Sequence, residues 1–470
     1  MILLSLLITT VSAQGKKSVV KHIEKNQETY KEVAHKIWEY AEVGYQEEKS
    51  SALLKSQLEA AGFSIESGVA GIPTSFVATY GSGSPTIGIL AEYDALPGIS
   101  QDNVAERKVR VEGAAGHACG HHLFGTASVA AAIAVKDWLS KSKKSGTIKL
   151  FGTPAEEGGA GKVYMVREGL FEDIDAVLHW HPGQGNGASA ASSLANKSAK
   201  FRFHGIASHA AGAPHFGRSA LDGVEAMNYM VNLMREHVTS DTRIHYVITK
   251  GGEAPNVVPE FAEVFYYVRH PETEGSRETF ERVVKAAEAA AMGTGTTMDY
   301  EVIHGLFNLM PNETLGRVVH GNMSEIGGFD YDADEMTFAE DIRESLPEKA
   351  RKALTTTNVI EPFEVIERGR GGSTDVGDVS WVVPTAGLRT ATWVPGTSAH
   401  TWQAVAAGGM SIGHKGMILA AKTIATSAVD LYNDPSIIQR ANEELMRRRG
   451  ADFKYEPLLG DRKPPLDYRK

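Results

Sequence analysis

The segment Thr86-Ile87-Gly88-Ile89-Leu90 is a short apolar run that leads into the polar turn Glu92-Tyr93-Asp94-Ala95-Leu96-Pro97. The same pattern returns along the chain, with strand-like runs over residues 147–151, 175–178 and 388–393 and an alanine-rich helical segment over 125–139. Strands that alternate with helices predict an α/β domain whose sheet is mostly parallel. Functional residues of such sheets lie where strands end and loops begin, so the polar turns are the first candidates for a site.

Residues 195–305 follow a different order. Strands are expected over 200–206, 243–250, 263–269 and 298–304, and helices over 219–237 and 276–291. This β-α-β-β-α-β order is that of a ferredoxin-like unit, which folds on its own. We therefore expect a domain inserted between two parts of one catalytic domain, residues 14–194 and 306–470. Before the first sheet strand, apolar residues at helical spacing over 18–61 predict two amphipathic helices.

Residues 1–13 have the features of a secretory signal peptide. An apolar run ends in Val11-Ser12-Ala13, the small-x-small pattern of a cleavage site, although no lysine or arginine precedes the run. A run of about ten residues is too short to span a bilayer, and no later segment reaches the roughly 18 apolar residues that a span needs. The sequence thus predicts a periplasmic or secreted protein without a membrane span, or a cytoplasmic one if the run is not a signal.

The composition excludes two further features. The net charge is −10 and no long basic run occurs, so no nucleic-acid partner is expected. Cys119 is the only cysteine, which excludes an internal disulfide. Its position inside a histidine cluster favours a chemical role over a structural one.

That cluster, Gly116-His117-Ala118-Cys119-Gly120-His121-His122, gathers three imidazoles and the thiol into seven positions. Thiolate and imidazole are common ligands of zinc and related metals, and a Cys-x-His spacing in a glycine-broken loop lets both side chains reach one ion. A loop of solvated histidines around a buried thiol is the alternative.

Three more strand ends carry side chains that could bind a metal, and they favour the metal site: Glu156 and Glu157, His179 or His181, and His400. Five ligands exceed what one tetrahedral ion takes, so two ions that share a bridging ligand are expected. We favour His181 over His179, because His181 precedes Pro182 and lies nearer the loop.

The adjacent carboxylates of Glu156 and Glu157 stand in a glycine-flanked turn and can point in different directions. One can then bind a metal while the other acts as general base on the attacking water. A solvated acidic turn is the alternative interpretation.

Together these motifs resemble the dinuclear-metal amidohydrolases, a family of aminoacylases, carboxypeptidases and auxin-conjugate hydrolases. The resemblance rests on Asp94-Ala95-Leu96-Pro97, His117-Ala118-Cys119-Gly120-His121, Glu156-Glu157-Gly158-Gly159, His181 and His400. It is greatest to the branch that contains the B subunits of p-aminobenzoyl-glutamate hydrolases, through Gly372-Ser373-Thr374-Asp375-Val376-Gly377-Asp378-Val379-Ser380-Trp381 and Gly396-Thr397-Ser398-Ala399-His400-Thr401-Trp402-Gln403. The implied fold is a zinc-peptidase-like catalytic domain with a mixed sheet and an inserted lid or dimerisation domain.

The resemblance also implies roles for single residues. Cys119 bridges two divalent ions (zinc or manganese, with cobalt possible), and the two centres are completed by His121, Glu157, His181 and His400. Glu156 is implied as the catalytic base.

Two residues of the inserted domain receive roles in the same way. His209 is implied to reach the active site of a partner subunit and stabilise the oxyanion, and Asn256 to hold the substrate's carboxylate end. Without the resemblance, His209 is an ordinary turn histidine and Asn256 a loop cap. We expect Asp94 to orient a ligand imidazole or the loop.

Two positions depart from the family. His122 stands where many auxin-conjugate hydrolases carry Asp, which weakens the transfer of their substrate preference. Glu92 stands where carboxypeptidase-type relatives use a metal-binding His, so the ligand set must be the one that contains cysteine.

The resulting hypothesis is a metal-dependent hydrolase that cleaves the amide of an N-acyl amino acid, with p-aminobenzoyl-glutamate or a related conjugate as substrate. It acts as a homodimer or as a heterodimer with a paralogous subunit. Auxin-type conjugates, N-acyl amino acids and dipeptides are alternative substrates, and a non-catalytic metal-dependent binding protein is an alternative of another class. No Gly-x-Ser-x-Gly elbow occurs, which argues against a serine hydrolase.

Overall fold

A six-stranded mixed sheet forms the centre of the larger of two domains in this computed structural model, which describes residues 2–469, with side chains described from Gln14 on. Its strand order is β1-β2-β4-β3-β5-β12. The strands are β1 (Ser64–Ser67), β2 (Phe76–Ser82), β3 (Thr86–Ala91), β4 (Gly146–Gly152), β5 (Ala176–Gly183) and β12 (Thr385–Ala391). Strands β4, β3, β5 and β12 are parallel, whereas β2 runs antiparallel to both of its neighbours, β1 and β4. The predicted α/β class is confirmed.

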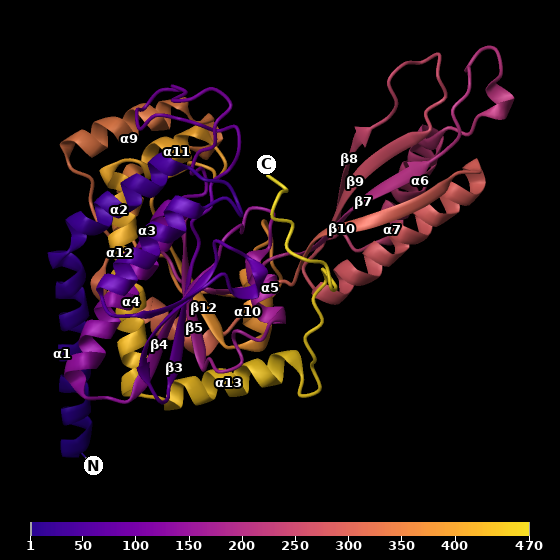
Figure 1. The fold of residues 1–470 in the computed structure, drawn as a ribbon. Coiled ribbons are helices and arrows are strands. Elements are labelled where there is room, and N and C mark those ends of the chain that lie inside the picture. Colours follow the sequence, from indigo (N-terminus) through magenta and orange to yellow (C-terminus); the bar gives the residue numbers. More distant parts are fainter. Residues whose placement is uncertain (1, 470) are drawn as a thin grey trace.

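Helices cover both faces of this sheet (Figure 1). One face packs in a single apolar cluster against α1 (Ile2–Lys25), α2 (Gln27–Tyr40), α3 (Glu48–Ala60), α4 (His121–Ser142), α8 (Glu313–Ile326) and α12 (Ser411–Asn433). The other face packs against α5 (Gly161–Arg167) and α10 (Val376–Val382). Helix α4 is buried on all sides over its first turns, between the sheet and other helices.

Further elements lie outside these layers. They are α9 (Ala333–Ser345), α11 (Trp402–Gly408) and a short parallel pair, β6 (Ala190–Ala191) with β11 (Val365–Ile366). Helix α13 (Ser436–Arg449) instead joins the cluster on the first face through Ile438 and Ala441.

The N-terminal region holds three helices where the sequence predicted two. The first break is at Asn26, whose side-chain amide donates to the carbonyl of His22 at 2.8 Å and so ends α1. Val19 and Ile23 of α1 are fully buried in the main cluster. The predicted signal peptide, residues 1–13, lies partly outside the described residues: its backbone from Ile2 belongs to α1, and its side chains are not described.

The second domain is an antiparallel four-stranded sheet with two helices on one face. Its elements are β7 (Ala195–His204), α6 (Ala220–Met234), β8 (Arg243–Lys250), β9 (Phe261–His270), α7 (Thr273–Thr294) and β10 (Thr297–Leu306), with strand order β10-β7-β9-β8. The predicted β-α-β-β-α-β order is confirmed. Along β9 side chains alternate, so Tyr266 and Val268 are buried under the helices while Tyr267 and Arg269 face the other way. We call this domain the lid; it projects from the larger domain in Figure 1.

Asp378 links helix α10 to the base of the lid. Its buried carboxylate accepts hydrogen bonds from the Phe307 amide at 3.0 Å and the Tyr455 hydroxyl at 2.7 Å. Burial raises the pKa of Asp378 from 3.8 to about 7. Between pH 3.8 and about pH 7, Asp378 keeps its proton in the folded state and has lost it in the unfolded state. The free energy of unfolding therefore decreases as pH rises through this range.

Replacing Asp378 by asparagine is expected to remove that pH dependence. The free energy of unfolding in urea, variant minus wild type, should increase from about pH 4 to about pH 7 and stay constant at higher pH. The exposed Asp467→Asn exchange serves as the control. A difference that is flat across the range would contradict the prediction.

Candidate metal centre

The structure brings the predicted ligands to one edge of the large sheet. Asp94 follows β3, the two glutamates follow β4, His181 lies near the end of β5 and His400 follows β12, while Cys119 and His121 stand at the start of α4. In each of three groups the candidate ligand atoms lie within 4.8 Å of one another. The groups are Cys119, His121 and His181; Cys119, Glu157 and His400; and Glu92, His121 and Glu156.

Cys119 belongs to two of these groups. Its Sγ lies 3.5 Å from Nε2 of His181, and Nε2 of His400 lies 3.0 Å from Oε1 of Glu157. The thiol is buried, and burial raises its pKa well above the usual range. A bound cation would reverse that effect, because a coordinating thiol is deprotonated. The sulfur is thus common to one group with His121 and His181 and to another with Glu157 and His400.

His121 is held between two carboxylates. Its Nδ1 is 2.8 Å from Asp94, and its Nε2 is 3.2 Å from Glu92. Burial alone would lower the pKa of His121, but Asp94, Cys119 and Glu92 outweigh it and raise the pKa well above 6.5. Asp94 also accepts the backbone N–H of Glu157 at 2.9 Å, so it orients two of the predicted ligands at once.

The donor set fits a metal ion. Nε2 of His121 and Oε2 of Glu92 face each other at 3.2 Å without a hydrogen bond between them, and among the described residues neither of these buried atoms has another hydrogen-bond partner. Such atoms are costly unless something binds them. Thiolate, imidazole and carboxylate together match the ligands of zinc, with manganese and cobalt compatible.

Glu156 lies beside this set. Burial and the nearby carboxylates of Glu92, Glu157 and Asp375 raise its pKa well above the usual range for Glu. A carboxyl group with a raised pKa suits a residue that must both accept and return a proton.

A buried lysine, which the sequence did not single out, supports this region. Lys162 in α5 is fully buried and pairs with Glu92 and Asp375, each at 2.7 Å. Desolvation would lower its pKa, but Asp375 and Glu92 outweigh it and raise the pKa above the usual range. In the sequence, its position shortly after Glu156 and Glu157 is the one local feature that points to a role near the metal ligands.

The histidines next to the ligands serve the core. His117 and His122 are buried, and each has its Nε2 3.0 Å from a backbone carbonyl, of Ile37 and Gly408 respectively. Burial lowers the pKa of His117 to about 3 and that of His122 well below 6.5. His179 points under β12, where a Cβ on Gly387 would lie 2.4 Å from its ring, and it belongs to none of the three ligand groups. The structure therefore groups His181 with the ligands, from within β5 rather than from the loop after it.

Two backbone features fix the ligand loops. His400 has a left-handed φ of 62°, and its N–H donates to the carbonyl of Ala118 at 2.9 Å, which ties the last ligand loop to the first. Gly120 has φ 77°, and a Cβ there would lie 2.7 Å from Cβ of Pro182. A non-glycine residue at 120 would meet both the conformational cost and the contact.

The Gly120→Ala variant is expected to lose roughly 1–3 kcal/mol of stability and part of its bound metal, because it displaces Cys119 and His121. Urea unfolding and metal analysis measure the two effects. Gly62→Ala is the matched control, since Gly62 also has a positive φ (90°) but nothing lies within 4 Å of its Cβ position. Equal metal content in the two variants would contradict the prediction.

His209 lies in the loop between β7 and α6 and Asn256 in the loop between β8 and β9. These loops are at the outer end of the lid, away from the large sheet (Figure 1). They neighbour each other, because the Ala210 N–H donates to the Asn256 carbonyl at 3.0 Å. Both are exposed or partly exposed, and neither lines the cavity beside the metal ligands. Their roles stay predictions that require a partner subunit or a movement of the lid.

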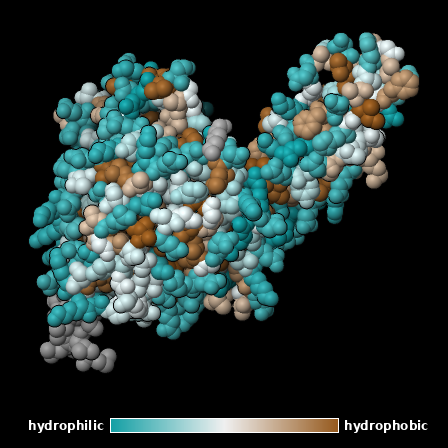
Figure 2. Space-filling model, in the orientation of Figure 1, coloured by the Kyte–Doolittle hydropathy of each residue, from teal (hydrophilic) through white to brown (hydrophobic). Residues whose placement is uncertain are grey.

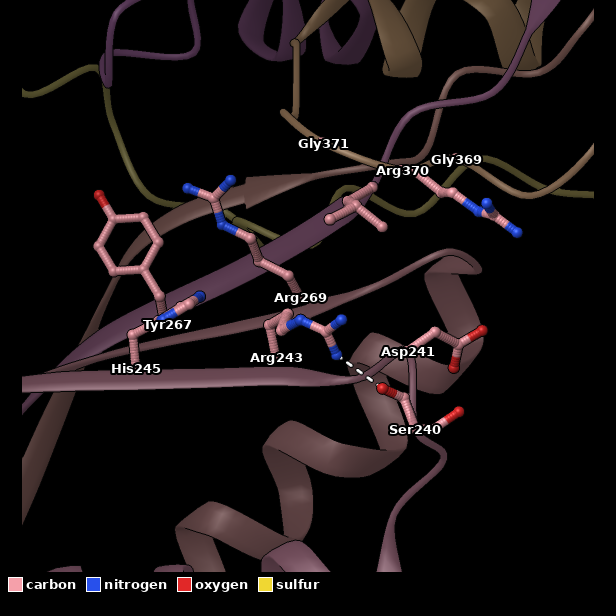
Figure 3. A pocket seen from close by; sticks show the side chains of 10 residues that line it. Ser240, Asp241, Arg243, His245, Tyr267, Arg269, Gly369, Arg370 and Gly371 are labelled. Atoms are coloured by element: carbon pink, nitrogen blue, oxygen red, sulfur yellow. Dashed lines mark hydrogen bonds between the residues drawn. The ribbon is translucent and has the colours of Figure 1, made fainter. Parts of the chain in front are cut away.

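Two cavities lie where the lid meets the larger domain. A smaller one of about 270 Å³ is lined by Glu156, Glu157 and His400 together with Tyr267, Arg269, His304 and Arg469. A larger one of about 880 Å³ shares Tyr267 and Arg269 and is otherwise lined by Arg243, His245, Asp241 and Gly369–Gly371 (Figure 3). Of these two cavities, only the smaller one is lined by predicted metal ligands, Glu157 and His400.

The family model described as peptidase family M20/M25/M40 matches residues 88–403. The chain belongs to this family. As an M20-family member it is a metal-dependent hydrolase of amide bonds.

The relatives are similar over most of their length. The B subunit of p-aminobenzoyl-glutamate hydrolase from Escherichia coli (strain K12) is 41% identical over 90% of this chain and 93% of its own. Xaa-Arg dipeptidase of Mus musculus is 29% identical over 92% of both chains. Among solved structures, the aminobenzoyl-glutamate utilization protein from Klebsiella pneumoniae has a TM-score of 0.60 at 16% identity, covering 87% of this chain and 97% of its own. A dinuclear metal-binding M20 peptidase from Bacillus subtilis has a TM-score of 0.59 at 16% identity, covering 87% and 99%. These structures share the fold.

Proposed function

We propose that this M20 enzyme hydrolyses the amide bond of p-aminobenzoyl-glutamate or a closely related aroyl or acyl amino acid. The observation that carries the proposal is the convergence of Cys119, His121, Glu157, His181 and His400 beside Glu156. The 41% identity to the B chain of the Escherichia coli p-aminobenzoyl-glutamate hydrolase, over nearly the whole sequence, supports the substrate.

The chain's own residues have separable tasks. Two divalent ions, zinc or manganese, would be held by Cys119 and the four other ligands, and would supply a polarised carbonyl and an acidified water. Glu156 takes the proton of the attacking water and returns it to the leaving amine. Asp94 keeps His121 and Glu157 in position through its two hydrogen bonds.

His209 is proposed to stabilise the oxyanion in the site of a partner subunit, and Asn256 to hold the substrate carboxylate. The lid offers a surface for such a partner, because β8 is an edge strand with Val247 and Ile248 exposed, and Phe216 near His209 is 70% exposed. Figure 2 shows apolar side chains among polar ones at the outer end of the lid. The partner is a second copy of the chain or a paralogous subunit.

We also infer that residues 1–13 direct export to the periplasm or the medium and are then removed; without such a signal the protein is cytoplasmic. Among residues 2–469 no helix is long and apolar enough to cross a membrane. N-terminal sequencing of the protein from an expressing cell tests the inference, and a mature chain that retains residues 1–13 would contradict it.

The substrate is tested by the release of p-aminobenzoate from p-aminobenzoyl-glutamate by the purified protein, with metal analysis of the same sample. The panel includes indole-acyl conjugates, N-acetyl amino acids and dipeptides. Faster turnover of one of these would replace the substrate and leave the mechanism in place. Metal binding without turnover of any of them would instead indicate a binding protein.

A further inference from the structure

The segment after α13, residues 451–469, contains no helix or strand and joins the two domains (Figure 1). Arg462 donates to the Ile303 carbonyl at 3.0 Å and to Glu301 at 2.8 Å, both on lid strand β10. From the larger domain, Arg167 of α5 donates to the Arg462 carbonyl at 2.7 Å. The segment is thus fastened to the lid and to the larger domain at the same residue.

From there the segment runs to the metal ligands. Gln46 donates to the Leu466 carbonyl at 2.8 Å, and the Tyr468 ring packs edge-on against Tyr45 with centroids 5.5 Å apart. The Tyr468 hydroxyl and the Arg469 guanidinium then both donate to the backbone carbonyl of Glu157, at 3.2 and 2.8 Å. Contacts of Leu466, Tyr468 and Arg469 itself therefore hold the Arg469 side chain in position beside Glu157.

Arg469 and Arg269 line the same cavity of about 270 Å³. Among the described residues, the Arg469 guanidinium contacts the Glu157 carbonyl and the Tyr468 ring, the Arg269 guanidinium contacts the Tyr267 ring, and neither forms an ion pair with a carboxylate. Figure 3 shows the guanidinium of Arg269 on the side of Tyr267 and away from Asp241. The carboxylates that line the cavity, Glu156 and Glu157, belong to the base and the metal ligands. Two guanidinium groups thus remain available to a ligand.

We propose that Arg469 recognises the side-chain carboxylate of an acidic leaving amino acid and so determines the specificity of the enzyme. This rests on the proposed amide hydrolysis at the neighbouring ligands. A substrate that ends in Glu or Asp carries two carboxylates, which match the two guanidinium groups in number and charge. Guanidinium binds carboxylate through two parallel hydrogen bonds, and a neutral side chain would leave one group without a partner.

The test compares p-aminobenzoyl-glutamate with p-aminobenzoyl-glutamine, which differ only in that carboxylate. In Arg469→Ala, kcat/KM for the glutamate conjugate should fall about 10- to 100-fold more than for the glutamine conjugate, since a hydrogen-bonded charge pair is lost for only one of them. Both substrates use the same metals and base, so a general disturbance of Glu157 cancels in the ratio. A ratio within about threefold of wild type would overturn the proposal.

Two further variants sharpen the result. Lys463→Ala removes an exposed cation from the same segment and should leave the ratio unchanged. Arg469→Lys keeps the charge but not the fork and should give an intermediate ratio. If the ratio of kcat/KM for the glutamate conjugate to that for the glutamine conjugate falls as far in Lys463→Ala as in Arg469→Ala, the effect is one of overall charge, and the proposal is overturned.

If the wild type hydrolyses neither conjugate, the proposed function is wrong on its substrate, and binding decides the role of Arg469 separately. Calorimetric titration of the metal-loaded protein with free glutamate and with glutamine gives the same comparison without turnover. A preference for glutamate that Arg469→Ala abolishes supports the proposal. Equal binding of the two by the wild type, or a preference that survives in the variant, overturns it.

Discussion

Replacing Glu156 by glutamine is expected to lower kcat by about three orders of magnitude or more, because the residue would serve in two proton transfers of the same reaction. Glutamine keeps the volume and one acceptor oxygen but cannot take a proton. The raised pKa of Glu156, caused by burial and by Glu92, Glu157 and Asp375, is that of a group poised to exchange one.

Metal analysis of the same variant separates two roles for Glu156. As a base it can be replaced with both ions retained, whereas as a ligand in the group with Glu92 and His121 its loss would release metal. Near-normal turnover with both ions bound would show that Glu156 is not the base. The exposed Glu168→Gln exchange, on the C-terminal side of α5, controls for the loss of one carboxylate.

Replacing Cys119 by serine is expected to weaken the binding of both metal ions together. The thiol is common to the group with His121 and His181 and to the group with Glu157 and His400. Loss of a residue that only orients a ligand lowers metal affinity about 10- to 100-fold, so loss of a shared ligand should cost more than about 100-fold at each ion. Metal content after dialysis against a weak chelator measures this.

His400→Ala is the matched comparison for Cys119→Ser. His400 belongs to only one of the three groups, so its loss should release one ion and leave the other bound. If Cys119→Ser also releases only one ion, the thiol does not bridge.

Much of the fold and of the ligand set could be predicted from the sequence, because both depend on local patterns. The alternation of strands and helices predicted the sheet and the lid, and the chemistry of the strand ends picked out the side chains that the structure groups together. The choice of His181 over His179 rested on a loop that is in fact strand, yet the residue chosen is the one beside Cys119.

What the sequence did not reveal depends on contacts between distant segments. Lys162 is an ordinary lysine until folding places it between Glu92 and Asp375. Arg469 lies more than 300 residues from Glu157, and no periodicity or spacing predicts that pairing. The roles of His209 and Asn256 rest on the family resemblance alone. Both residues lie in loops of the lid, and those roles would depend on a second chain or on lid movement.

The hydrogen bond from His400 to Ala118 also bears on the order in which the protein matures. As the chain leaves the ribosome, Cys119, His121, Glu157 and His181 all emerge before the lid, whereas β12 and His400 follow it. Domains generally fold as units during synthesis, so the lid is complete before the last ligand exists. Closing the metal site thus requires β12 to join the sheet beside β5 across the whole inserted domain, a slow non-local pairing. A nascent chain that stops after the lid therefore lacks the predicted ligand His400. We expect such a chain to bind less metal than the full-length protein.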